Sequence, residues 1–539
     1  METVRGLLAG RLRTEALLAM ADSADDANTA AYARFFLGLW HEANGDEVLA
    51  AQQFALAAAA PSSDFVGKVM ELHFLRFNAR LNLGGVPRSS LGAYTCPRII
   101  VGGWQLSSGH SRHPEGDDLE AMRARCVADL AAQAEAGLIA SDFGDIYTGV
   151  EVIVGRFVER HVAAGKLRSD LLLHTKLVPD LDLLSTYDGA MTRRIVQRSC
   201  ARLQTSYVDL VQFHWWDLSV RRYVQVALQL AELKQEGLIR EIGLTNFALQ
   251  QTRELREAGV PVASTQVQLS LIDRRAEASG LCSYCAQEGI AVLAYGLLAG
   301  GLLSDKYLGA APLSASSQNE TRSLTKYLLV LEEAGGWPAL QAMLQTLRRV
   351  ADRQTPTATI AQVVIAWTLS RPAVASAIVG ARGVGQISST LAATLLRLDE
   401  ASLAEVTATA DAVFTPLPGE VYELERKREG PHGSIMRYNL QAPGGTAAAD
   451  ELEDRIAWAE ACLDDQRLVA SGDGASARRY VAARRFEHQA GVHLEEAEAL
   501  AAGPNDEEAA ARAAQLVERL RLQMRTRGAQ AELTAQYKC

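Results

Sequence analysis

The stretch SDFGDIY, residues 141–147, ends one short apolar run, and two further runs, LLLHTK (171–176) and DLVQFH (209–214), follow it along the chain. Short apolar runs of this kind are typical of buried strands, and the segments between them carry helical periodicity. Strands that alternate with helices predict a parallel sheet. Because the carboxyl ends of parallel strands share one edge, we expect the polar residues that end these runs to lie near one another.

The same alternation extends from Arg98 to about Val413, with eight apolar runs inside it. They are RIIVGGW, LIASDF, LLLHTKL, VDLVQFH, IREIGLT, VASTQVQL, IAVLAYG and ASAIVGA. A closed barrel of eight strand–helix units takes about 250 residues plus insertions, which fits this span. The sequence therefore predicts an α/β fold, a (β/α)8 TIM barrel, over residues 97–413. Residues 300–354 exceed a simple crossover, so we expect a substrate loop and an extra helix there.

Both flanks of the barrel are predicted to be all-α. Residues 1–84 carry helical periodicity, and some of their small and aromatic residues fall almost where a tetratricopeptide repeat has them. These residues are Leu37, Gly38, Gly45, Ala50, Phe54, Ala57 and Pro61. One convincing repeat leaves two interpretations open, a helical hairpin packed on the barrel or a peptide-binding array. Residues 414–446 predict an irregular linker, and residues 447–539 predict amphipathic helices of a small bundle or coiled coil.

Charge and hydrophobicity narrow the classes of partner. A net charge of -10, with lysine and arginine scattered among acids, disfavours binding to nucleic acid or to an anionic membrane. No apolar run reaches the roughly 18 residues of a membrane helix. The N-terminal stretch has arginines among leucines, as transit peptides do, but Glu2 and Glu15 favour an ordinary amphipathic helix. We therefore expect a soluble, cytoplasmic protein.

The seven cysteines are an odd number and lie far apart, which is typical of a reduced protein without a disulfide framework. Cys282 and Cys285 form the one CxxC motif, inside a helical pattern. No second cysteine pair or histidine stands at zinc-ligand spacing from them. The sequence favours a core-filling role for these two cysteines over a metal or redox role.

Four polar residues stand at or just after the ends of the second, third and fourth runs: Asp142, Tyr147, Lys176 and His214. A free phenol has a pKa of about 10 and gives up its proton reluctantly, but a nearby ammonium stabilises the developing phenolate. Each residue alone has a structural alternative, as a surface lysine, a loop aromatic or a satisfied core histidine. Together they form a proton donor with its tuning groups, which suits carbonyl reduction.

Eight ordered motifs give residues 97–413 a resemblance to the aldo-keto reductase superfamily. They are GGWQLSSG, DFGDIYTG, HTK, QFHWWD, IGLTNF, QVQLSLIDRR, AYGLLAGGLLSDKYLG and IVGARGVGQ. The resemblance implies that Tyr147 is the general acid for a carbonyl reduced by hydride from NADPH. It also implies that Asp142 holds and orients Lys176, and that His214 bonds the carbonyl and shares proton delivery.

The resemblance also implies a set of cofactor-binding residues. They are Gly103, Trp104, Thr245, Asn246, Gln266, Tyr295, Gly296, Leu298, Gly300, Arg382 and Gln386. In this set, Tyr295 is expected to stack on the nicotinamide ring and Arg382 to pair with the adenosine 2′-phosphate, which favours NADPH over NADH.

The sequence departs from the family pattern at two places. Gly296 and Leu297 replace a common serine and proline, and Ser389 and Thr390 replace an acidic residue and an asparagine expected near the adenine. These departures could weaken cofactor affinity but leave the proton donor intact.

Three tryptophans, Trp104, Trp215 and Trp216, are expected at the substrate mouth, unless one or two of them only plug the top of the barrel. The leading hypothesis is an NADPH-dependent enzyme that reduces a small aldehyde or ketone. The alternative is a weak or inactive barrel that serves as a structural or regulatory subunit and binds a protein partner through its terminal helices.

Overall fold

The computed structural model describes most of the predicted barrel and parts of its flanks. The described residues are 19–21, 27–43, 50, 53–54, 57, 86–107, 119–147, 149–313, 321–355, 357–380, 386–436 and 438. Apart from helix α3 (Ala27–Ala43) and a few neighbouring residues, the predicted helical segment 1–84 lies outside this set. The predicted helical extension 447–539 and Arg382 also lie outside it.

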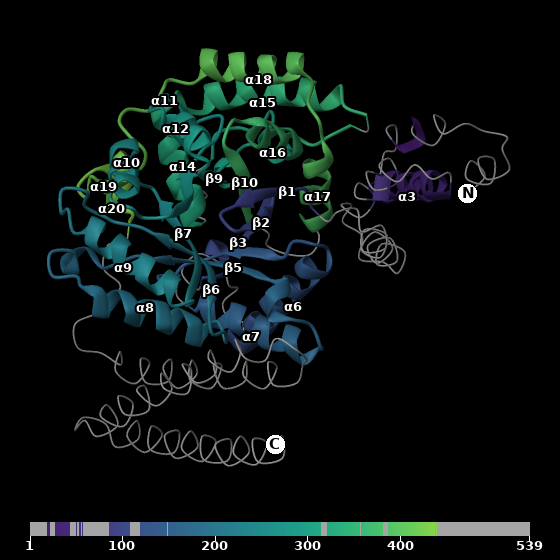
Figure 1. Cartoon of the computed structure of the whole chain (residues 1–539). Helices are drawn as coiled ribbons and strands as arrows, with labels where there is room; N and C mark the ends of the chain where they lie inside the picture. Colours follow the sequence, from purple (N-terminus) through teal and green to yellow (C-terminus); the bar gives the residue numbers. More distant parts are fainter. Residues whose placement is uncertain are drawn as a thin grey trace, which may run out of the picture.

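Eight parallel strands close into a barrel in the order β10-β3-β4-β5-β6-β7-β8-β9 (Figure 1). The strands are β3 (Ile99–Gly102), β4 (Ala140–Asp142), β5 (Leu172–Leu177), β6 (Val208–Phe213), β7 (Ile239–Thr245), β8 (Val262–Gln268), β9 (Ala291–Tyr295) and β10 (Val374–Gly380). Each strand falls in one of the eight predicted apolar runs, so the predicted (β/α)8 barrel is confirmed. Nearly all their residues are buried, the polar ones as well as the apolar ones.

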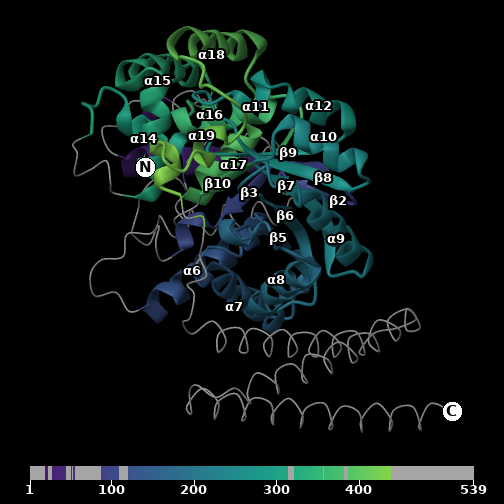
Figure 2. The ribbon, with the colours of Figure 1, turned by 90° about the vertical axis from the view of Figure 1, so that its left-hand side faces the viewer.

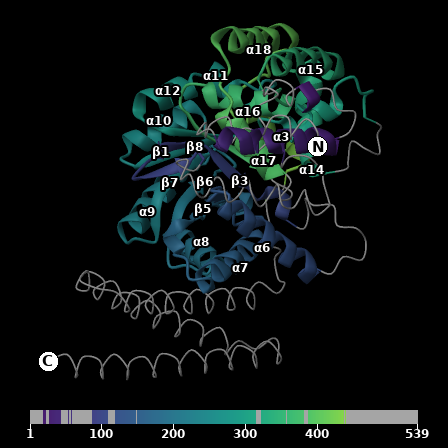
Figure 3. The same cartoon turned by 90° about the vertical axis from the view of Figure 1, so that its right-hand side faces the viewer.

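Helices surround the strands. They are α6 (Leu119–Glu135), α7 (Val150–Ala163), α8 (Gly189–Arg202), α9 (Tyr223–Gln235), α10 (Leu249–Glu257), α11 (Arg275–Ala278), α12 (Leu281–Glu288), α14 (Arg322–Glu333), α15 (Gly336–Asp352), α16 (Ile360–Ser370), α17 (Ile387–Leu395) and α18 (Glu400–Val413). Helices α14 and α15 are the insertion expected after the seventh strand. In all three views α15 lies beside α18 on the outside of the barrel (Figure 1, Figure 2 and Figure 3).

The strand register brings the predicted catalytic residues to one rim. Asp142 pairs with Gly102 on one side and His174 on the other, and Lys176 pairs with Gln212. Asp142 is the last residue of β4, and Lys176 is the penultimate residue of β5. Their side chains therefore converge at the carboxyl ends of the strands, as predicted.

A two-stranded antiparallel hairpin, β1 (Arg88–Leu91) and β2 (Tyr94–Pro97), precedes the barrel. The sequence did not predict these two strands, because RSSLGAYTCP (88–97) has no continuous apolar run. Leu91 and Cys96 are fully buried and pack with Leu210 of β6 and Leu293 of β9. The hairpin therefore covers apolar side chains inside the barrel that the strands alone would leave in contact with water.

The CxxC cysteines are core residues. Cys282 and Cys285 are buried in α12, and burial raises the pKa of each thiol to about 12. Their core-filling role is confirmed. Within the described ranges, no helix is both long enough and apolar enough to cross a bilayer.

The hairpin gives a first prediction. Leu91→Ala should lower the free energy of unfolding by about 2–5 kcal/mol, because it leaves a cavity under the barrel. Urea unfolding followed by circular dichroism would measure the change. Leu167→Ala is the matched control, since Leu167 is 58% exposed, and it should leave the midpoint near the wild-type value. Equal midpoints for the two variants would contradict the packing role of the hairpin.

Candidate functional site

A cavity of ≈ 930 Å³ opens at the carboxyl ends of the strands. Of the expected catalytic and cofactor-binding residues, every one that the structure describes lines it. They are Gly103, Trp104, Asp142, Tyr147, Lys176, His214, Thr245, Asn246, Gln266, Tyr295, Gly296, Leu298, Gly300 and Gln386. The structure thus places residues from all eight strands or their following loops around one space.

The floor of the cavity holds a buried ion pair. The Lys176 Nζ donates to Asp142 Oδ1 at 2.6 Å and to the Phe143 carbonyl at 2.7 Å, and both charged side chains are about 5% exposed. Burial alone would lower the pKa of Lys176, but the Asp142 carboxylate and the Tyr147 hydroxyl together raise it. Lys176 is therefore a fixed ammonium at neutral pH.

Two glutamines hold the other carboxylate oxygen. Gln212 of β6 and Gln266 of β8 each donate to Asp142 Oδ2, at 2.5 and 2.7 Å. Gln266 also donates to Gln212 Oε1 at 2.6 Å. Since both amide hydrogens of Gln266 are engaged, only its oxygen can accept a bond from a bound carboxamide. The network fixes Asp142 in place, and Asp142 in turn fixes Lys176.

Tyr147 lies next to this ammonium on the same rim. The Lys176 Nζ is 5.0 Å from the centroid of the Tyr147 ring. Burial raises the pKa of Tyr147 above its usual value, and Lys176 opposes that rise. Burial is the larger effect, so the phenol keeps its proton at neutral pH and is present as an acid rather than a phenolate.

His214 follows β6 and faces the cavity with one nitrogen. Its Nδ1 lies 3.1 Å from the Thr245 carbonyl, and since a carbonyl only accepts, this nitrogen carries the proton. Burial, reinforced by the positive charge of Arg426, lowers the pKa of His214 to about 3. The ring is therefore neutral, and its buried Nε2, which has no hydrogen-bond partner within the described chain, is an acceptor.

The residues after β7 and β9 form a second polar group. Asn246 has a positive φ of 61°, a left-handed conformation that asparagine tolerates better than most residues, and its Oδ1 accepts from the Tyr295 hydroxyl at 3.0 Å. The Thr245 Oγ1 is buried, and among the described residues no partner for it is found. The unpaired Thr245 hydroxyl, beside the Asn246 amide and the Tyr295 ring, is suited to hydrogen-bond the carboxamide of a nicotinamide.

One departure from the family pattern has a structural reason. Gly296 has a φ of +71°, and a Cβ at this position would lie 2.2 Å from the hydroxyl of Tyr327 on α14. A serine here would clash with Tyr327 in a strained backbone conformation. The inserted helix α14 therefore accounts for the glycine.

The three tryptophans do not share one role. Trp104 and Trp216 line the cavity, as expected. Trp215 instead is fully buried, packs against Tyr187 and Phe213, and donates to the Val220 carbonyl at 2.9 Å. The expectation that Trp215 lines the substrate mouth is wrong, because adjacent residues in extended chain point in opposite directions.

Sequence reasoning missed several residues of the cavity region. Gln212 could have been found, because it stands two residues before His214 and so points to the same side of β6. Lys326 of α14 and Tyr422 carry no motif, and Glu425 and Arg426 stand in the charged stretch ERKREG (425–430) of the expected linker. Tyr422 lines the cavity with Lys326, and Glu425 and Arg426 pack behind it.

Comparison with known proteins identifies the class that this barrel and site define. The profile of the Aldo/keto reductase family matches residues 98–411, more than half of the chain. The chain belongs to this family.

Two related proteins and one solved structure can be compared with the chain individually. The chain is 34% identical to the flagellar radial spoke protein 5 of Chlamydomonas reinhardtii, over 38% of this chain and 45% of that protein, so it spans less than half of this relative's length. It is 30% identical to the aldo-keto reductase YhdN of Bacillus subtilis, over 44% of this chain and 69% of that protein. A solved thermostable aldo-keto reductase, Tm1743, is 24% identical with a TM-score of 0.46, over 60% of this chain and 99% of that one.

The buried neutral histidine gives a second prediction. The folded pKa of His214 is lowered to about 3, so below its unfolded value near 6.5 the unfolded chain binds the extra proton and stability falls as pH falls. Between pH 6 and 4, the free energy of unfolding of the wild type should fall by about 1.4 kcal/mol per pH unit more than that of His214→Gln. Urea titrations at several pH values would measure both slopes. Parallel slopes would show that His214 is not buried in the neutral form.

Proposed function

We propose that this chain is an NADPH-dependent oxidoreductase that reduces a small aldehyde or ketone to an alcohol, with Tyr147 as the general acid. The observation that carries the proposal is the partly buried ring of Tyr147, which lies 5.0 Å from the fixed ammonium of Lys176 at the rim of the cavity. Membership of the Aldo/keto reductase family supports an oxidoreductase, and the finer statements on cofactor and residue roles are our proposal.

The side chains that line the cavity are chemically suited to bind a nicotinamide dinucleotide. The Thr245 hydroxyl and the Gln266 oxygen are available to its carboxamide, and Tyr295 offers a flat ring. When bound, this cofactor would supply the hydride to the carbonyl carbon. Gly301 also lines the cavity, and a Cβ built there would meet nothing within 4 Å, so the backbone at this turn is open to the close approach of a diphosphate.

The chain's own contribution is proton delivery and orientation. Tyr147 donates its proton to the carbonyl oxygen as negative charge develops there, and Lys176 stabilises the phenolate that remains. Asp142 keeps Lys176 charged and aimed at the ring. Because the free Nε2 of His214 is an acceptor, we assign it to orient the hydroxyl of Tyr147 or of the alcohol, rather than to donate to the carbonyl.

The direct test is Tyr147→Phe. The variant should bind NADPH with wild-type affinity, measured by tryptophan quenching, and lose about 10²–10⁴-fold in kcat for aldehyde-dependent NADPH oxidation. Tyr284→Phe, a tyrosine of α12 outside the cavity, is the control and should retain full activity. Unchanged turnover in Tyr147→Phe would exclude Tyr147 as the acid.

The expected cofactor preference is tested at Arg382, whose proposed role depends on the family resemblance. Arg382→Ser should weaken NADPH binding by about tenfold or more through the loss of a charge-assisted hydrogen bond, and leave NADH binding unchanged. Titrations of both dinucleotides measure the two dissociation constants. An equal increase in both dissociation constants would show that Arg382 does not bind the 2′-phosphate.

A second candidate function is service as a subunit of a protein assembly. The similarity to a flagellar radial spoke protein favours it, and the two functions can coexist. Sedimentation of the full chain against chains lacking residues 1–84 or 440–539 tests the candidate. A complex that only the full chain forms, and that Tyr147→Phe forms equally well, would support an assembly role independent of catalysis.

A further inference from the structure

The segment that follows the barrel crosses the mouth of the cavity. It begins after α18, beyond the residues matched by the family profile, and contains two short helices, α19 (Glu423–Arg426) and α20 (Pro431–Ser434). Tyr422, Ser434, Ile435 and Met436 of this segment line the cavity. The sequence predicted an irregular linker here, but the described part of it is packed against the site.

Tyr422 of this segment contacts His214, one of the proposed catalytic residues. Its ring meets the ring of His214 edge-on, with centroids 5.4 Å apart, and lies 6.5 Å from the ring of Trp216. It is 8% exposed, and its hydroxyl donates to the Met436 sulfur at 3.4 Å. Tyr422 and Trp216 therefore form an aromatic wall against the ring of His214.

The backbone of Tyr422 is strained to reach this place. Its φ of 62° and ψ of 17° lie in the left-handed region, which a bulky side chain rarely adopts. Strain of this kind persists where surrounding contacts enforce it, and it concentrates at functional sites. The conformation turns the ring toward His214.

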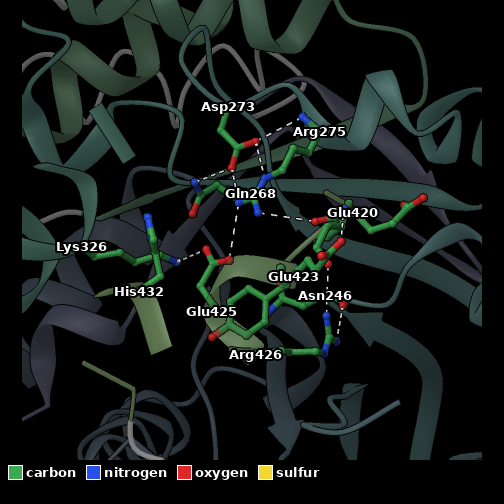
Figure 4. Close-up of polar contacts among 12 residues, drawn as sticks. Asn246, Gln268, Asp273, Arg275, Lys326, Glu420, Glu423, Glu425, Arg426 and His432 are labelled. Carbon is green, nitrogen blue, oxygen red and sulfur yellow. Dashed lines mark hydrogen bonds and ion pairs between the residues drawn. The ribbon is translucent and has the colours of Figure 1, made fainter. Parts of the chain in front are cut away.

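Two sets of contacts enforce the strained turn. The Arg426 guanidinium donates to three backbone carbonyls at the strand ends, those of Trp215, Trp216 and Asn246, the last at 2.7 Å. On the other side, Glu425 is fully buried between two cations (Figure 4). Its oxygens lie 3.5 Å from the Arg275 guanidinium and 3.9 Å from the Lys326 ammonium.

The two cations that hold Glu425 are anchored in the barrel and in its insertion. Arg275 forms a two-point ion pair with Asp273, which accepts from Gln268 at the end of β8. Lys326 comes from α14, and its ammonium lies 5.1 Å from the centroid of the Tyr295 ring and 5.5 Å from that of Tyr422. The ionic cluster therefore links the expected cofactor wall to the segment that carries Tyr422.

We propose that Tyr422 is a specificity-determining wall of the carbonyl site, and that Glu425 positions it by pairing with Lys326 and Arg275. This inference builds on the proposed function. Removing one partner from a buried ion cluster leaves the others uncompensated, so loss of the Glu425 charge releases the turn. The wall then withdraws from His214, and the mouth widens toward larger carbonyl compounds.

The test compares two aldehydes with the same reacting group, benzaldehyde and biphenyl-4-carbaldehyde, in the full chain. Glu425→Gln should raise KM for benzaldehyde with kcat little changed, and shift the kcat/KM ratio about tenfold toward the biphenyl compound. Glu423→Gln is the matched control, because Glu423 stands on the same turn, is 41% exposed and pairs with the exposed Lys427. It should leave the ratio at the wild-type value.

A second variant removes the wall without touching the ion cluster. Tyr422→Gly suits the left-handed backbone and should give the same shift in ratio with folding intact, whereas the control Glu423→Gln should not. If Glu425→Gln does not fold, the kcat/KM ratio of Tyr422→Gly for the two aldehydes tests the proposal instead. A wild-type ratio in Tyr422→Gly would overturn the proposal.

Hydrogen exchange of residues 420–436 separates this inference from the proposed function. Exchange in this segment should be about tenfold faster in Glu425→Gln than in Glu423→Gln, because the segment opens locally. Equal exchange in the two variants would overturn the positioning role of Glu425, whatever the activity. A wild type that binds NADPH but reduces neither aldehyde, nor any other carbonyl compound, would overturn the proposed function and with it the specificity role of Tyr422.

Discussion

The site depends on one buried ion pair, between Lys176 and Asp142. A lysine ammonium loses its hydration on burial, and it stays charged only where a fixed carboxylate and hydrogen bonds replace the lost water. Two strand ends supply the pair, and glutamines from two other strands, Gln212 and Gln266, hold the carboxylate. The closed barrel brings these four strands to one rim. A single ammonium is thereby held beside Tyr147.

Burial raises the pKa of Tyr147 and lowers the pKa of His214. Both side chains are therefore neutral at neutral pH, and the cavity holds one proton donor, Tyr147, and one acceptor, His214. Around them the chain adds a second set of buried charges, centred on Glu425. We propose that the first set serves proton transfer and the second shapes the mouth, so substitutions in the two sets are expected to change different kinetic constants.

The sequence predicted the barrel and the convergence of the proposed catalytic residues at one rim, because both depend on local signals. Each strand is a short apolar run, and Asp142 and Lys176 stand directly at strand ends. The hairpin before the barrel was missed, because its four-residue strands are polar on one face and only tertiary packing buries Leu91. The roles of Tyr422 and Glu425 could not be predicted, since a glutamate in a charged stretch is normally exposed and its burial depends on cations from distant helices.

The most direct measurement is the protonation state of Lys176, followed by the ¹⁵N chemical shift of its Nζ from pH 7 to 11. The ion pair with Asp142 predicts that in the wild type the pKa of Lys176 lies above its ordinary value, and that it falls in Asp142→Asn. A wild-type lysine that loses its proton below its ordinary pKa, or one that does not respond to Asp142→Asn, would contradict the account.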